Sequence, residues 1–151
     1  MKQKTLFKLS DYTSEHGGEL SKGKRKSRRP LSLNLPHHFI LSAETSECGS
    51  LVRHRNDVLN CLYEMAKRFS VTLHEQSVNS NHSHLMISFP SRNAYLGFIR
   101  LTTATLTRKI KVKWKLTPYS RMVHWGKEFE SVRIYIERNE FEARGLTVYK
   151  R

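Results

Sequence analysis

The sequence predicts an α+β fold in which helices cover an antiparallel sheet. Three features predict it: segments with alternating apolar residues, segments with apolar residues at helical spacing, and the order in which they follow one another. With 151 residues, 38% of them hydrophobic, the chain is long enough for one domain with its own core. Its net charge of +14 favours a polyanionic partner, most commonly nucleic acid.

The first half of the predicted core contains a strand, a helix and a hairpin. Residues 38–43 (HFILSA) are typical of a strand, and residues 55–69 place apolar side chains at the spacing of one helix face. Residues 71–78 and 83–89 predict two further strands. The short segment NSN at 79–81 separates them and suits a hairpin turn, so these two strands should be neighbours.

The second half contains two helices with a strand between them. A helix is expected from Ser91 to about residue 111, with Ser91 as its N-cap, and a strand over 119–125. A last helix is expected over 128–144, because Gly145 is a natural C-terminal stop. The resulting order, β-α-β-β-α-β-α, is a ferredoxin-like split βαβ core with an additional C-terminal helix.

A basic segment precedes this core. The stretch from Ser21 to Pro30 carries six cations and only polar or charged residues before its final proline, so we expect residues 1–30 to form a flexible arm and residues 31–151 the folded domain. The arm cations expected to contact phosphates are Lys22, Lys24, Arg25, Lys26, Arg28 and Arg29. Arg121, Lys127 and Arg133 are expected to add phosphate contacts from the domain.

The sequence also indicates a compartment. No apolar run approaches the roughly 20 residues that a membrane span needs, and the first ten residues lack the apolar stretch of a signal peptide. Cys48 and Cys61 form no CxxC pattern, which is consistent with two plain thiols in a reducing environment. We therefore expect a cytoplasmic, nucleoid-associated protein of the bacterial type, with no membrane partner.

The segment NHSHLMISF raises the question of a metal site. In a strand, His82 and His84 point to the same face, while Ser83 and Leu85 point to the other. Two neighbouring neutral imidazoles can bind one divalent cation. A His-x-His pair on an open sheet face is, however, more often simply polar, so the spacing alone leaves both interpretations open.

The last predicted helix supplies two more candidate groups. Phe129, Val132 and Ile136 form its apolar stripe, and Tyr135 and Asn139 lie one turn apart at the margin of that stripe. A tyrosine oxygen can attack a phosphodiester beside a bound cation, and an amide oxygen suits Mg²⁺ or Mn²⁺. The alternative for Tyr135 is a half-buried aromatic residue with its hydroxyl in water.

Two segments together resemble a known family. SVNSNHSHLMI is similar to the His-hydrophobic-His segment of the single-tyrosine HUH transposases, and VRIYIERNEFEARGL resembles the tyrosine helix of the REP-associated tyrosine transposases. The resemblance implies that His82 and His84 ligate a divalent cation, Mg²⁺ or Mn²⁺, with Asn139 in the position of the third ligand. It implies that Tyr135 is the nucleophile of a single-stranded DNA nickase and strand transferase with a 5′-phosphotyrosine intermediate, acting near hairpins. The family is commonly homodimeric, and its tyrosine helix packs in cis or in trans.

Two departures from the family pattern stand out. Ser83 replaces the usual bulky hydrophobe between the histidines, and Glu140 replaces the proline that usually follows the asparagine. Neither removes a catalytic atom, so an active enzyme is favoured over a relic. Two rival functions remain: a non-catalytic protein that binds single-stranded or hairpin DNA or RNA on the same fold, and a metal-dependent nuclease that uses water instead of Tyr135.

Overall fold

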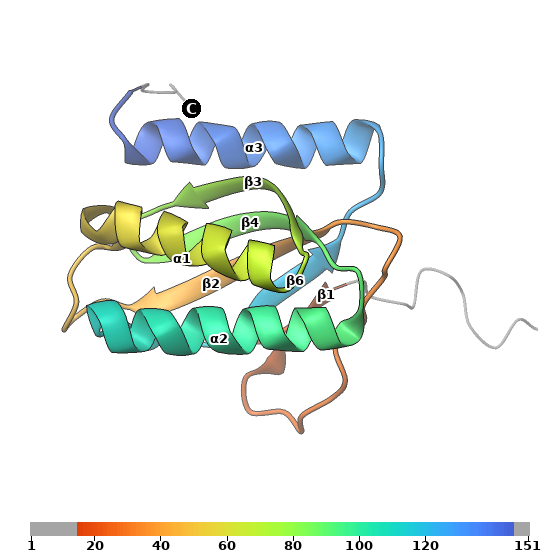
Figure 1. The fold of residues 1–151 in the computed structure, drawn as a ribbon, viewed down its shortest axis with the longest axis horizontal. Helices are drawn as coiled ribbons and strands as arrows, with labels where there is room; N and C mark the ends of the chain where they lie inside the picture. The colour runs from red at the N-terminus through yellow and green to blue at the C-terminus, as the bar shows by residue number, and fades with distance from the viewer. Residues whose placement is uncertain (1–14, 147–151) are drawn as a thin grey trace, which may run out of the picture.

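The computed structural model describes residues 15–146, and in it an antiparallel six-stranded sheet carries three helices (Figure 1). The strands are β1 (Glu15–His16), β2 (His37–Glu44), β3 (Thr72–Val78), β4 (His82–Ser88), β5 (Lys113–Trp114) and β6 (Tyr119–Met122). The helices are α1 (Arg55–Arg68), α2 (Arg92–Ile110) and α3 (Lys127–Ala143), with short 3-10 turns at Gly18–Ser21 and Leu51–His54.

The strand order confirms the predicted fold class. The sheet runs β1-β6-β2-β4-β3, with β5 paired to the end of β2, and every pairing is antiparallel. Its four long strands, in the order β6-β2-β4-β3, give the split βαβ arrangement that the sequence predicts. β3 therefore forms one edge of the sheet, directly beside the strand that carries His82 and His84.

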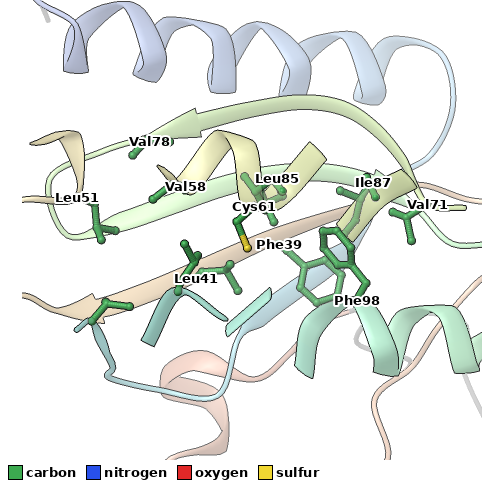
Figure 2. Packing of buried hydrophobic residues seen from close by; sticks show 14 of the residues in the cluster. Phe39, Leu41, Leu51, Val58, Cys61, Val71, Val78, Leu85, Ile87 and Phe98 are labelled. Carbon is green, nitrogen blue, oxygen red and sulfur yellow. The ribbon is translucent and has the colours of Figure 1, made fainter. Parts of the chain in front are cut away.

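The two faces of the sheet are covered unequally. On one face, α1 and α2 pack over a cluster of nineteen buried apolar residues that includes Leu85 and Ile87 of β4 (Figure 2). On the other face, α3 packs over a cluster with four buried residues, among them Met86. Alternation along β4 thus sends its odd-numbered residues to the large core and leaves His82 and His84 under α3.

Local signals in the sequence explain the start of α2 and the end of α3. The Ser91 side chain accepts a hydrogen bond from the backbone N–H of Ala94 at 3.0 Å and caps α2, as predicted. Gly145, two residues past α3, has φ of 67°, a conformation that favours glycine. The strand predicted over 119–125 ends earlier, at Met122.

None of the helices in residues 15–146 is long and apolar enough to cross a membrane.

Residues 15–30 differ from the predicted flexible arm, whose first fourteen residues lie outside the described range. β1 pairs with β6 through Glu15 and His16. Arg29 is buried at 6% exposure, where it donates to the hydroxyl of Tyr95 at 2.7 Å and to Ser120 Oγ at 2.6 Å. Its guanidinium also lies 5.2 Å from the centroid of the Phe39 ring. Arg29 therefore fastens this segment to the domain, because its N–H groups donate to neutral oxygens that are far away in sequence.

A buried histidine at the start of β2 makes folding sensitive to acid. His37 is fully buried, and desolvation, followed by repulsion from Arg29, lowers its pKa to about 4. Unfolded, it has the ordinary pKa of about 6.5. Between these values only the unfolded chain takes up the proton, so the contribution of His37 to stability is complete above pH 6.5 and is lost as the pH falls toward 4.

We expect the free energy of unfolding, measured by urea titration, to decrease from pH 7 to pH 4.5. His38 and His84 have lowered pKa values too and add to this decrease. His37→Gln keeps a hydrogen-bonding side chain that does not titrate, so its decrease should be smaller by on the order of 2 kcal/mol. The same slope in both proteins would show that His37 does not carry this acid sensitivity.

Candidate active site

The two predicted metal-binding histidines lie side by side on β4. Their rings meet edge to face, with centroids 4.8 Å apart, and their Nε2 atoms approach to 3.1 Å. Register places them beside the middle of β2, where His84 faces Ile40 and His82 faces Ser42. His84 is buried, whereas His82 is half-buried, so the pair opens toward solvent from the His82 side.

The other ring nitrogens of this pair already have partners. His82 Nδ1 lies 2.8 Å from Oδ1 of Asn81, and His84 Nδ1 lies 2.9 Å from Nε2 of His38. In the tautomer in which Nδ1 of each ring carries the proton and donates to its partner, both Nε2 atoms are free to ligate an ion. Two nitrogens bound at about 2.1 Å and about 90° to one ion lie about 3.0 Å apart, so the pair fits a divalent cation.

His38 also belongs to the site. The sequence alone gives no sign that this histidine is more than a structural or surface residue. It lies on β2, its ring stacks on His84 with centroids 5.1 Å apart, and its Nε2 fixes the His84 ring through Nδ1. Desolvation, then repulsion from Arg121, lowers the pKa of His38 to about 4, and desolvation, then its histidine neighbours, lowers the pKa of His84 to about 3. Both rings are therefore neutral at pH 7, the state that a metal ligand requires.

Tyr135 of α3 lies directly over these histidines, and it comes from the same chain. Its ring stands edge-on to His84 with centroids 5.5 Å apart, and edge-on to His38 at 6.3 Å. Half of the tyrosine side chain remains exposed, at 52%. Val132 and Ile136, one on each side of it in sequence, are buried against Met86, so the packing of α3 orients Tyr135 toward the pair.

Asn139 lies one turn further along α3, where the sequence places it. Its amide nitrogen donates to the carbonyl of Tyr135 at 2.8 Å, and its own carbonyl accepts from the Asn79 side chain at 3.4 Å. Within residues 15–146, no set of three histidine, cysteine or carboxylate side chains is grouped to hold a metal. The two histidines would thus share an ion with oxygen donors, and the role of Asn139 as a ligand stays a prediction.

The remaining predicted phosphate contacts fall into two sets. On the α3 side, Arg121 pairs with Glu128, and Arg133 pairs with Glu130 at 3.1 Å, whereas Lys127 is exposed at the start of α3.

His74 lies on β3, the strand next to β4. It shares a hydrogen bond of 2.8 Å with Ser88, at the end of β4 opposite to His82. His74 is therefore not part of the histidine cluster.

The second set forms a basic groove on the α2 side of the molecule. The groove has a volume of about 650 Å³ between residues 21–29 and the first half of α2. Its lining includes the cations Lys24, Arg25, Lys26, Arg28, Arg29, Arg92 and Arg100 and no carboxylate. Lys22 is not part of this lining and faces Glu19 at 4.0 Å. The sequence does not reveal Arg92 and Arg100 as groove residues, because only the packing of α2 brings them beside the basic segment.

Comparison with known proteins identifies the family of this chain and a similar fold. The family described as "Transposase IS200 like" matches residues 33–140, whereas no curated protein matches the chain. A solved REP-associated tyrosine transposase, described as bound to a REP hairpin, is similar in fold with a TM-score of 0.61 and 12% identity, over 82% of this chain and 76% of that one. A protein of Deinococcus radiodurans R1 described as a transposase gives a TM-score of 0.47 at 12% identity, over 77% of this chain and 98% of that one. Because the family match covers more than half of the sequence and includes both histidines and Tyr135, this chain belongs to the IS200-like transposases.

Proposed function

We propose that this transposase cuts and rejoins single-stranded DNA at hairpin-forming sites, with Tyr135 as the nucleophile. The observation that carries the proposal is the position of the half-exposed Tyr135 over two imidazoles whose Nε2 atoms converge. A tyrosine with only a structural role does not need such a pair beneath it. The hairpin part is supported by the similar solved structure, which is described as a complex with a REP hairpin.

The proposed reaction is a transesterification. The Tyr135 oxygen attacks the phosphorus of a phosphodiester and loses its proton, the bond from phosphorus to the 3′ oxygen breaks, and that oxygen leaves as a 3′-hydroxyl. The 5′ end is then held as a phosphotyrosine, and attack by another 3′-hydroxyl reverses the step. The number of phosphoester bonds is conserved, so rejoining needs no added energy source.

The histidines suit a divalent cation, Mg²⁺ or Mn²⁺, held by His82 and His84 with oxygen donors such as Asn139 completing its shell. When bound, such an ion supplies Lewis-acid polarisation of a phosphate oxygen. As acceptors for the two Nδ1–H groups, Asn81 and His38 would hold the imidazoles in the ligating tautomer. The small apolar cluster beneath α3 keeps the phenol of Tyr135 beside them.

A covalent-trapping assay tests the proposal. Labelled single-stranded hairpin DNA is incubated with the protein and Mn²⁺ or Mg²⁺, and adducts that survive denaturing electrophoresis are counted. We expect an adduct that needs the metal and is destroyed by protease. Tight binding without an adduct in either metal would favour the non-catalytic hairpin binder, and cleavage without an adduct would favour water as the nucleophile.

We further propose that the basic groove holds the phosphate backbone of the DNA. Lys24, Lys26 and Arg28 are exposed there, and no carboxylate among residues 15–146 pairs with them. Arg29 is excluded as a free phosphate ligand because its donors are already used inside the protein. The groove lies on the α2 side of the sheet and Tyr135 on the α3 side, so binding and chemistry should be separable by mutation.

Neutralising Lys24 and Lys26 by glutamine should weaken hairpin binding and reduce its salt dependence. Removal of one ionic interaction with a phosphate lowers the slope of log Kd against log salt by about 0.7 to 0.9, and fluorescence anisotropy at several salt concentrations measures that slope. Lys67→Gln, at an exposed lysine of α1 outside the groove lining, is the matched control and should leave the slope unchanged. Equal slopes in all variants would place the DNA elsewhere.

A further inference from the structure

The C-terminal half of α3 is attached to the sheet by a buried carboxylate. Glu140 is 9% exposed and continues the stripe of Val132 and Ile136, one turn further along the helix. The apolar cluster that holds α3 ends at Ile136, so Glu140 occupies the place where another apolar contact would be expected. A buried carboxylate is costly unless its charge and oxygens are satisfied.

Both oxygens of this carboxylate have partners outside α3. Oε1 accepts from Nε of Arg55 at 2.6 Å, and Arg55 Nη2 forms a second contact with the same oxygen. Oε2 accepts from the backbone N–H of Val78 at 2.9 Å. Beside this contact, the Asn79 side chain donates to the carbonyl of Asn139 at 3.4 Å. The partners of Glu140 are thus one arginine and one strand end.

The positions of these partners decide what the contact does. Val78 is the last residue of β3, the edge strand, and Arg55 is the first residue of α1, on the opposite face of the sheet from α3. Arg55 therefore reaches around the sheet edge to the helix that carries the tyrosine. The carboxylate also accepts a hydrogen bond from the backbone N–H of Val78 at the edge of the sheet. Because this bond is directional, it fixes where the end of α3 lies against β3.

We propose that Glu140 and Arg55 form a latch that positions α3, and through it Tyr135, over the histidine pair. Tyr135 lies on α3 between the cluster residues Val132 and Ile136, just over one turn before Glu140 of this latch, and it is itself half exposed. With the latch open, the helix would keep its apolar attachment but lose its fixed end, so the phenol would spend less time at the reacting phosphate. Glu140 is a positioning residue, and its role in the reaction depends on the proposed function of Tyr135.

The test compares Glu140→Gln and Glu140→Ala with Glu142→Gln. Glu142 lies two residues further on α3, is exposed and undergoes the same chemical change. Hydrogen exchange followed by mass spectrometry reports the latch without any DNA. We expect the C-terminal peptides of α3 to exchange at least about tenfold faster in the Glu140 variants, while β4 peptides and Glu142→Gln remain at the wild-type rate.

Single-turnover adduct formation reports the positioning of Tyr135. The rate should fall at least about tenfold in Glu140→Ala, while the Kd for hairpin DNA changes less than about threefold. The rate of adduct formation should fall by a similar factor in Arg55→Ala, and only a little further in the double variant. Arg55→Lys, which keeps a cation, should recover part of the rate. Such rescue is not expected from a residue with only a general effect on folding.

The possible failures are distinguishable. If the wild-type protein forms no adduct, the proposed function fails, and hydrogen exchange still decides whether the latch exists. If α3 in Glu140→Gln and Glu140→Ala exchanges at the rate of Glu142→Gln, the latch is overturned. Equal acceleration of α3 and β4 would also overturn it, because Glu140 would then support the whole domain instead of one helix.

Discussion

Tyr135→Phe is expected to abolish the covalent protein–DNA adduct, with a loss of at least about 10³-fold in rate. The change removes one oxygen and keeps the ring that packs edge-on to His84 and His38. Since the side chain is 52% exposed, the free energy of unfolding should change by less than about 0.5 kcal/mol. Hairpin affinity should stay within about threefold, because the basic groove lies on the other side of the sheet.

The same variant tests whether the site is complete within one chain. The structure places Tyr135 over His84 of its own chain. A mixture of Tyr135→Phe with His84→Ala should therefore form no more adduct than either variant alone. An adduct in the mixture would mean that α3 is exchanged between two chains, as in a swapped dimer. Persistent cleavage by Tyr135→Phe alone would instead assign the attack to water.

The sequence predicts the fold well because the strong signals are local. Alternation along β2 and β4, the cap at Ser91 and the stop at Gly145 each depend on a few neighbouring residues. β1 and β5 are only two residues long, and they exist because β6 and β2 offer them a pairing edge. The buried position of Arg29 was not predictable from its basic neighbours, since it depends on Tyr95 and Ser120, far away in sequence.

The site was predictable only where it depends on spacing within one element. His82 and His84 share a face because strands have a period of two, and Tyr135 lies at the margin of a helical stripe. His38 was missed because its proximity to His84 depends on the register between β2 and β4, which no spacing reveals. Glu140 stands out in the sequence only as a departure from the family pattern, since its partners Arg55 and Val78 become visible only in the folded chain.

Metal affinity should depend on His84 directly and on His38 through it. We expect His84→Ala to abolish specific Mn²⁺ binding, measured by electron paramagnetic resonance titration in the absence of DNA, because only one imidazole then remains. His38→Ala should weaken binding by about 10- to 100-fold, the usual effect of removing the partner that orients a ligating histidine. His38→Gln keeps an acceptor for the Nδ1–H of His84 and should recover part of that loss.

A fourth histidine on the same sheet face provides the control for this series. His74 is half-buried and hydrogen-bonded to Ser88, away from the pair, so His74→Ala removes an imidazole without touching the site. If His74→Ala weakens Mn²⁺ binding as much as His38→Ala, the effect comes from general loss of packing under α3. If only His38→Ala and His84→Ala act, the hydrogen bond between His38 Nε2 and His84 Nδ1 determines how strongly the converging Nε2 atoms hold the ion.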